Sequence, residues 1–80
     1  MPALTDLDVL TKARTWAGTG VARKIRENVG ASRREYGAEC GLSAETIRAY
    51  ESGRRRPRGQ HGVAYGRLLV KHAGLGAGRS

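Results

Sequence analysis

Apolar residues along this chain recur every three or four positions, the spacing of an amphipathic α-helix, and no segment shows the alternation of a β-strand. The first such segment predicts a helix over residues 5–17, with Thr5 as its N-cap and the run 18–20 (Gly-Thr-Gly) as its stop signal. Its expected inward face consists of Leu7, Leu10, Ala13, Trp16 and Ala17.

A second helix is predicted over residues 19–28. Val21, Ile25 and Val29 stand four apart, so they are expected to share its inward face. The opposite face is mostly charged and carries Arg23, Lys24, Arg26 and Glu27. Gly30 is expected to close this helix, because glycine adopts the left-handed conformation common just after a helix end.

A third helix is predicted from Ser32, because Glu35 follows three residues later and completes a capping box. Tyr36 and Cys40 form its expected inward stripe. Cys40 is the only cysteine, so an intramolecular disulfide and a cysteine metal site are both excluded. We interpret Cys40 as a small buried apolar residue rather than a reactive thiol.

A sharp turn is predicted at Gly41, with Leu42 filling the corner and Ser43 capping a fourth helix that ends near Glu51 or Ser52. In that helix Ile47 and Tyr50 are expected to point to the core. The outer side is expected to hold Ala44, Glu45, Arg48 and Ala49, with Thr46 at the boundary.

A charged connection follows the fourth helix. Residues 54–59 (Arg-Arg-Arg-Pro-Arg-Gly) cannot be helical throughout, because of the proline and of repulsion between like charges. A last helix is predicted over residues 60–73, and its expected core residues are Val63, Ala64, Leu68 and Leu69. Residues 74–80, rich in glycine, are expected to form a flexible tail.

Charge is distributed unevenly along the 80 residues, which are enough for one domain, expected over residues 1–73. The formal net charge is +8, of which residues 1–47 contribute +1 and residues 48–80 contribute +7. Arginine dominates the basic residues, and its guanidinium group can bond phosphate or guanine in two places. A polyanionic partner is therefore expected to bind the second half of the chain.

Several other classes of function are disfavoured. No apolar run approaches transmembrane length, and the early aspartates argue against a signal peptide, so we expect a cytoplasmic protein without a membrane partner. His61 and His72 lack acidic or cysteine partners at metal-binding spacing, and we expect them to be exposed or to have packing roles. No nucleotide-phosphate fingerprint occurs. Neither an enzyme nor a cofactor is expected.

The segment 32–52 combines two short helices, a tight turn and adjacent positive charge, an arrangement that places one helix in the major groove of DNA. Its runs Gly30-Ala31-Ser32, Gly41-Leu42-Ser43 and Tyr50-Glu51-Ser52-Gly53-Arg54-Arg55-Arg56-Pro57 resemble the lambda-repressor-like (Cro/C1 or XRE) helix-turn-helix family. The resemblance covers about residues 21–73. It implies an all-α, compact five-helix lambda-repressor-like domain, in which residues 5–17 form an extra N-terminal helix.

The resemblance also implies roles for individual residues. The base-facing positions of the recognition helix, residues 43–51, are Ala44, Glu45, Thr46, Arg48 and Ala49. Arg33 is expected near the DNA backbone, where the family often has glutamine, and Arg26 and Glu51 are expected to form a structural ion pair. The full expected set of phosphate contacts is Arg33, Ser43, Arg54, Arg55, Arg56 and Arg58.

Two departures from the family pattern lie on the third helix. Gly37 stands where the family usually has alanine; it permits close helix packing but costs roughly 1 kcal/mol of helix propensity. Tyr36 replaces the usual leucine, so its hydroxyl needs a hydrogen-bond partner or access to solvent.

Glu45 has two interpretations at this level. An acid on a basic DNA-facing surface repels phosphate, which suggests that it accepts a hydrogen bond from cytosine N4. Alternatively, it stabilises the dipole in the first turn of its helix. Arg48 can reach guanine or a phosphate, and Ala44 a thymine methyl group.

The expected function is sequence-specific binding of double-stranded DNA by a transcriptional regulator, a phage Cro or immunity-type repressor that acts by operator occupancy. Two alternatives stay open: an antitoxin-like interaction module, and an excision or recombination accessory factor. The extra N-terminal helix with Trp16 could serve a protein contact. A monomer in solution is favoured over a homodimer, because the predicted tail offers no apolar dimer patch.

Overall fold

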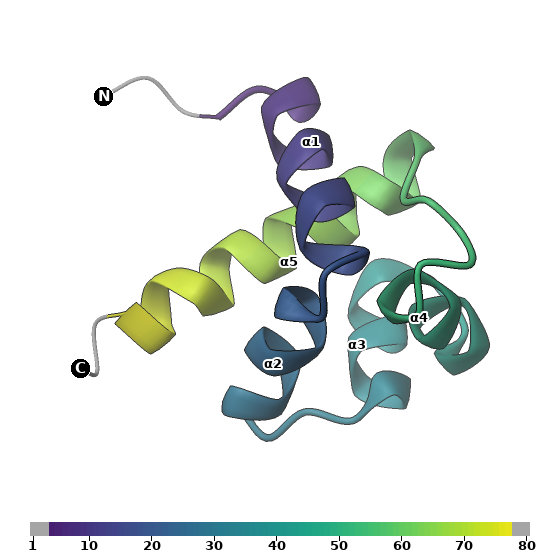
Figure 1. Ribbon diagram of the computed structural model, residues 1–80, viewed down its shortest axis with the longest axis vertical. Coiled ribbons are helices and arrows are strands. Elements are labelled where there is room, and N and C mark those ends of the chain that lie inside the picture. Colours follow the sequence, from purple (N-terminus) through teal and green to yellow (C-terminus); the bar gives the residue numbers. More distant parts are fainter. Residues whose placement is uncertain (1–3, 78–80) are drawn as a thin grey trace.

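The computed structural model describes residues 4–77, and the only regular secondary structure over that range is α-helix. Its helices are α1 (Asp6–Ala17), α2 (Val21–Asn28), α3 (Arg33–Cys40), α4 (Ala44–Glu51) and α5 (Gly59–Ala77). The long α5 crosses the molecule and contacts α1, α2 and α3, whereas α4 packs on α3 (Figure 1). The expected all-α, five-helix architecture is therefore confirmed. No helix in the described part of the chain is long and apolar enough to cross a membrane.

Side-chain caps begin three of the helices as predicted. Thr5 accepts a hydrogen bond from the amide of Asp8 at 3.1 Å, and Ser32 accepts one from Glu35 at 3.0 Å. Both are full capping boxes, because each acid also accepts from the backbone amide of its cap residue. Hydrogen bonds with the backbone amide and the side chain of Ser32 lower the pKa of the Glu35 carboxyl group. Ser43 caps α4 by accepting from the amide of Thr46 at 3.1 Å.

Positive-φ glycines set two turns. Gly41 has φ +73° at the C-terminus of α3, which is the left-handed geometry predicted there. Gly20 has φ +86° and caps α2. Because an α-helix cannot pass through that conformation, α2 begins at Val21, and the predicted start at residue 19 is wrong by two residues.

α1 and α5 cross at close range through two glycines of α5. A Cβ atom placed on Gly66 would lie 2.6 Å from Val9 Cγ1 and 2.8 Å from the Val9 carbonyl oxygen. One on Gly62 would lie 3.0 Å from Leu10 Cδ1. These glycines are four residues apart, so together they form the smooth surface on which α1 lies. Their spacing was visible in the sequence, but it was not interpreted as a packing surface.

This crossing corrects the predicted inward face of α1. Val9, Ala13 and Ala17 are buried, whereas Leu7 is 67% exposed, although it was expected in the core. At the start of α1, the observed inward face is rotated by about half a turn from the predicted one, because the glycines of α5 leave room for Val9. Leu10 is half-buried, as expected for a residue at the edge of the contact between α1 and α5.

The inward face of α2 also differs from the prediction. Val21 and Val29 are 40% and 37% exposed, so two of the three valine and isoleucine positions expected in the core lie at its edge. Ile25 is buried, and it is joined by Ala22 and by the charged residue Arg26. A four-residue repeat drifts around a helix with a period of 3.6 residues, and α2 therefore presents positions 22, 25 and 26 to the core.

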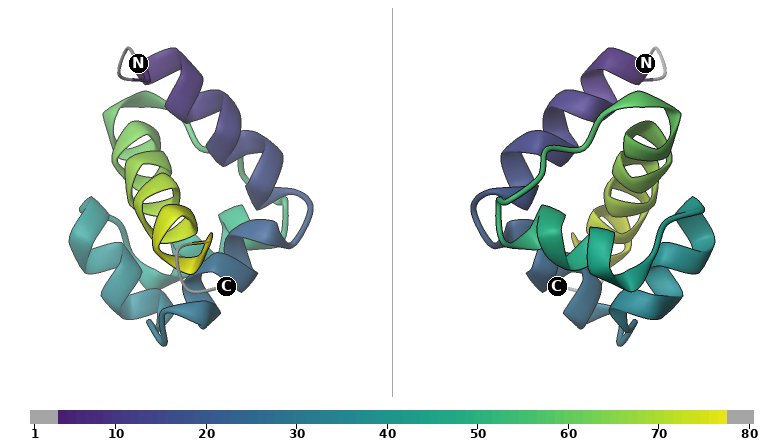
Figure 2. Two further views of the ribbon diagram at one scale, coloured as in Figure 1. Left: turned by 90° about the vertical axis from the view of Figure 1, so that its left-hand side faces the viewer. Right: turned by 90° about the vertical axis from the view of Figure 1, so that its right-hand side faces the viewer.

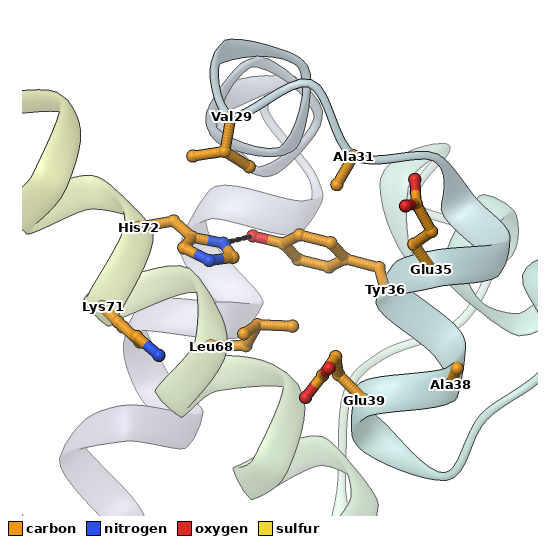
Figure 3. Close-up of a pocket in the computed structure, with 9 residues that line it drawn as sticks. All are labelled: Val29, Ala31, Glu35, Tyr36, Ala38, Glu39, Leu68, Lys71 and His72. Atoms are coloured by element: carbon orange, nitrogen blue, oxygen red, sulfur yellow. Dashed lines mark hydrogen bonds between the residues drawn. The ribbon is translucent and has the colours of Figure 1, made fainter.

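Three tyrosines fill the centre of the core. Tyr36 and Tyr50 were expected there, and Tyr65, which is fully buried, was not predicted. The Tyr65 ring lies 6.2 Å from that of Tyr36 and 5.0 Å from that of Tyr50. The Tyr36 hydroxyl bonds His72 Nδ1 at 2.6 Å, which ties α3 to α5 (Figure 3). His72 therefore has the packing role that the sequence allowed.

α5 extends beyond both predicted ends. It starts at Gly59 rather than at residue 60, and it continues to Ala77 rather than stopping at residue 73. Residues 74–77 were expected in a flexible tail and are instead helical, whereas residues 78–80 of that expected tail lie outside the described part. A glycine inside a helix costs only about 1 kcal/mol relative to alanine, so glycine-rich composition does not by itself end a helix. Leu69 is buried in the core as predicted, and Val63, Ala64 and Leu68 are half-buried.

Candidate DNA interface

The turn between α3 and α4 is built for close approach. The Leu42 amide donates to the Gly37 carbonyl oxygen at 2.8 Å. A Cβ atom on Gly37 would clash with the Leu42 carbonyl group, whose carbon would lie 3.1 Å away. Gly37 therefore permits a tighter turn than alanine would, and the half-buried Leu42 side chain packs against the core. The turn holds α4 in a fixed direction relative to α3.

The inner side of α4 is more extensive than predicted. Ile47 and Tyr50 are buried as expected. Ala49 was expected to face DNA bases and is only 2% exposed, so that assignment is wrong. At the C-terminal end of α4, the amides of Arg54 and Arg55 both donate to the Ala49 carbonyl oxygen, at 3.0 and 3.2 Å. These hydrogen bonds tie the start of the connection to the last turn of α4.

The outer side of α4 presents two charged side chains. The side chains of Glu45 and Arg48 are 71% and 68% exposed, and their nearest charged atoms are 3.8 Å apart. Such an exposed pair contributes at most about 1 kcal/mol to stability, so both groups are free to bind a ligand. Ala44 and Thr46 are half-buried, and the Thr46 hydroxyl lies 3.0 Å from that of Ser43. The exposed face of α4 is therefore narrower than the predicted set of five residues.

A buried charge network lies beneath α4. Glu51, whose side chain is 3% exposed, accepts from Arg26 Nε at 2.6 Å and from Arg26 Nη2 at 3.2 Å. The ion pair expected from the family resemblance is thus present, and it raises the pKa of Arg26. Arg26 Nη1 also donates to the Ala31 carbonyl oxygen at 2.8 Å. The network joins α2, the start of α3 and the end of α4.

Arg33 joins the same network from the first turn of α3. Its Nε donates to Glu51 Oε1 at 3.0 Å, while its side chain stays 37% exposed. The sequence predicted an approach to the DNA backbone but not this contact. An arginine held through Nε keeps its two terminal nitrogens for another acceptor, so the contact orients Arg33 without consuming all of its donors.

The connection between α4 and α5 displays the densest positive charge. Four of its arginines are exposed: Arg54, Arg55, Arg56 and Arg58. The last three line a shallow surface recess of about 180 Å³. Pro57, between them, is buried. In Figure 1 the connection and α4 lie on the right-hand edge, away from the C-terminal end of α5.

Contacts with this connection were missed by the sequence analysis. Arg14 of α1 donates through Nε to the Pro57 carbonyl oxygen at 2.9 Å, across 43 residues. Nothing in the local sequence indicates this bond, because arginine is common in the last turn of a helix, where its charge interacts favourably with the helix dipole.

The surroundings of Cys40 include a histidine of α5: His61 Nδ1 lies 3.1 Å from the Cys40 carbonyl oxygen. Burial raises the pKa of the Cys40 thiol to about 11, so the expectation of an unreactive cysteine agrees with its setting.

A second surface hollow lies away from the arginines, between α3, α5 and the end of α2 (Figure 3). Its volume is about 420 Å³, and the Tyr36–His72 hydrogen bond crosses it. Glu35 and Glu39 stand on one side and Lys71 on the other. Two carboxylates make this hollow unsuited to a phosphate backbone, so the candidate nucleic-acid surface is confined to α4, the start of α3 and the arginine connection.

Comparison with known proteins agrees with this geometry. Residues 23–69, more than half of the chain, match a family model described as helix-turn-helix. The match includes α3, α4, the arginine connection and much of α5. No curated protein and no solved structure gave a significant match. With its helix-turn-helix of α3 and α4, the chain belongs to the lambda-repressor-like helix-turn-helix family of DNA-binding regulators.

Proposed function

We propose that the protein is a sequence-specific repressor of the phage Cro or immunity type, which binds double-stranded DNA and acts by occupying an operator. The observation that supports this most strongly is a pair of exposed charges on the outer face of α4, the Glu45 carboxylate in its first turn and the Arg48 guanidinium in its last turn. A cluster of exposed arginines lies on the connection that directly follows α4. This is the charge pattern of a helix that reads base edges while its surroundings bind phosphates.

Affinity and specificity come from different residues in this proposal. The exposed arginines Arg54, Arg55, Arg56 and Arg58 bind phosphates, together with the free terminal nitrogens of Arg33. Glu45 accepts a hydrogen bond from cytosine N4, and Arg48 donates to guanine or to a phosphate. The narrow exposed face of α4 limits direct reading to a few base pairs, since Ala49 is buried.

Selection of bound duplexes from a random DNA pool tests the specificity. We expect a defined motif that contains a cytosine whose replacement costs about 1–3 kcal/mol. Glu45→Ala should relax that one position, and Glu45→Gln should shift it towards adenine, because an amide pairs with adenine N6 and N7. A pool without any enriched motif would refute sequence-specific binding, and an unchanged motif in both variants would assign Glu45 to the helix dipole. A single unsymmetrical half-site would support binding as a monomer.

Salt dependence tests the electrostatic part. With four phosphates neutralised, log affinity should fall with log salt concentration at a slope of about −3.6. Arg55→Ala should make this slope less steep by about 0.9 and weaken binding to all sequences alike. Binding that does not depend on salt would contradict the assignment of the arginine connection.

A further inference from the structure

The connection between α4 and α5 is fixed in two different ways along its length. Its first half is held by α4 itself, since the amides of Arg54 and Arg55 donate to Ala49. Its second half leaves α4 and runs beside α1, as the right-hand view of Figure 2 shows. There the Pro57 carbonyl oxygen accepts from Arg14 Nε at 2.9 Å. Residues 56–58 thus depend on α1, which lies outside the residues matched by the helix-turn-helix family model.

Arg14 can hold the second half of the connection in place because α1 itself packs closely against α5. Leu10, one turn earlier, lies against α5 where a Cβ on Gly62 would come within 3.0 Å of it. The same Gly62 position would come within 2.9 Å of the Pro57 carbonyl carbon. α1, the buried proline and the first turns of α5 therefore meet at one point. A hydrogen bond from a charged guanidinium to a carbonyl oxygen is stronger than one between neutral groups.

The hydrogen bond from Arg14 to Pro57 can act as an anchor that opposes charge repulsion among the arginines of the connection. Arg55, Arg56 and Arg58 surround one recess, and like charges held together repel one another when no anion is bound. A connection without an anchor would spread these side chains and their backbone apart. An anchor that holds the backbone in the bound shape lowers the entropy lost when an anion binds.

We propose that Arg14 is a positioning residue for DNA binding: through its hydrogen bond to Pro57 it holds the second half of the arginine connection in the shape that accepts backbone phosphates. The extra N-terminal helix is then part of the DNA-binding machinery, although Arg14 need not touch DNA. This inference rests on the proposed function, since the arginine connection must first be a phosphate-binding element.

The test compares three variants of the full chain. Arg14→Met removes both the charge and the donor. Arg14→Lys keeps the charge but places a methylene where Arg14 carries Nε. Lys12→Met, on the same helix, removes one exposed charge, whose ammonium group lies 5.4 Å from the centroid of the Trp16 ring, and serves as the matched control for net charge. Each variant is measured for affinity to the selected duplex, for the selected motif, and for backbone amide exchange at Arg56 and Arg58 without DNA.

We expect Arg14→Met and Arg14→Lys to lose about five- to tenfold in affinity, the range set by one hydrogen bond. The selected motif should not change, because the base-reading face of α4 is untouched. Amide exchange should rise at Arg56 and Arg58 and stay the same at Ile47, which confirms that the fold persists. Lys12→Met should show less than a twofold change in affinity and no change in exchange.

The outcomes separate the two proposals. A wild-type protein that binds no duplex refutes the proposed function, whereas altered exchange at Arg56 and Arg58 in Arg14→Met would still establish the anchor. Wild-type affinity in Arg14→Lys would show that charge alone matters and would overturn the positioning role. Unchanged exchange in both Arg14 variants would overturn it as well. If Arg14→Met fails to fold, Arg14→Lys carries the same comparison.

Discussion

Glu45 and Glu51 belong to the same short helix, yet their surroundings are opposite. Glu45 lies on the outer face of α4 with a side chain that is 71% exposed and a single loose partner 3.8 Å away. Glu51 lies at the inner end with a side chain that is 3% exposed and accepts hydrogen bonds from two arginines. The comparison teaches that charge on this helix has two separate uses, one in the proposed DNA binding and one in architecture.

The difference follows from the cost of removing a carboxylate from water. A buried charge is tolerated only when it is paired and its hydrogen bonds are satisfied, and the network around Glu51 meets that condition through Arg26 and Arg33. An exposed charge stays hydrated, so its loss affects stability little. In the proposed function, substitutions on the outer face of α4 can therefore change DNA reading at little cost in stability, while the inner network joins α4 to α2 and to the start of α3.

The largest expected effect breaks the inner network. Glu51→Ala leaves the buried guanidinium of Arg26 without its partner, and this should cost about 3–5 kcal/mol of unfolding free energy. Glu45→Ala is the matched control on the same helix and should change the unfolding free energy by no more than about 0.5 kcal/mol. Urea denaturation of both variants measures the contrast. Equal losses in the two variants would contradict the division between the inner and outer faces.

An intermediate effect tests whether the architecture extends to α1. Gly66→Ala places a Cβ against the Val9 carbonyl oxygen, and overpacking of about 1–3 kcal/mol should outweigh the helix propensity gained, about 1 kcal/mol. Gly74→Ala, on the same helix, meets no atom within 4 Å and should stabilise by up to about 1 kcal/mol. Thermal unfolding compares the two. A stabilised Gly66→Ala protein would show that α1 is not tightly seated on α5.

The smallest expected effect is a pH dependence of the unfolding free energy that arises from the Tyr36–His72 hydrogen bond. Burial, followed by the charge of Lys71, lowers the pKa of His72, and at pH 7 the neutral ring shares a hydrogen bond of 2.6 Å with the Tyr36 hydroxyl. A lowered folded pKa means that this contribution is fully present above the unfolded value of about 6.5 and is lost as pH falls through the folded value. We expect a loss of about 1 kcal/mol across that window, the value of one hydrogen bond.

Measurement of unfolding free energy from pH 7 down to pH 5 checks this expectation, with His72→Gln as the control that should remove this part of the pH dependence. If wild type and His72→Gln lose stability in parallel, the dependence comes from other groups.

The sequence determined most of the local structure and the location of the reading surface. Thr5, Ser32 and Ser43 begin their helices as predicted, because capping depends on atoms within three residues. Gly41 ends α3 as predicted, because only glycine adopts its conformation at low cost. The family motif located α4, and the pairing of Arg26 with Glu51 followed from it. Whether the expected DNA contacts form stays a prediction.

Only the tertiary structure decided which surface each helix buries and what supports the arginine connection. Leu7 is exposed because the glycines of α5 leave room for Val9 instead, and Ala49 is buried although the helical pattern placed it on the outer side of α4. Arg14 meets Pro57 across 43 residues. Helical periodicity reports that one face is apolar, but the crossing angle of two helices depends on side-chain shapes from distant segments. No local pattern carries that information, so these contacts became visible only in the assembled fold.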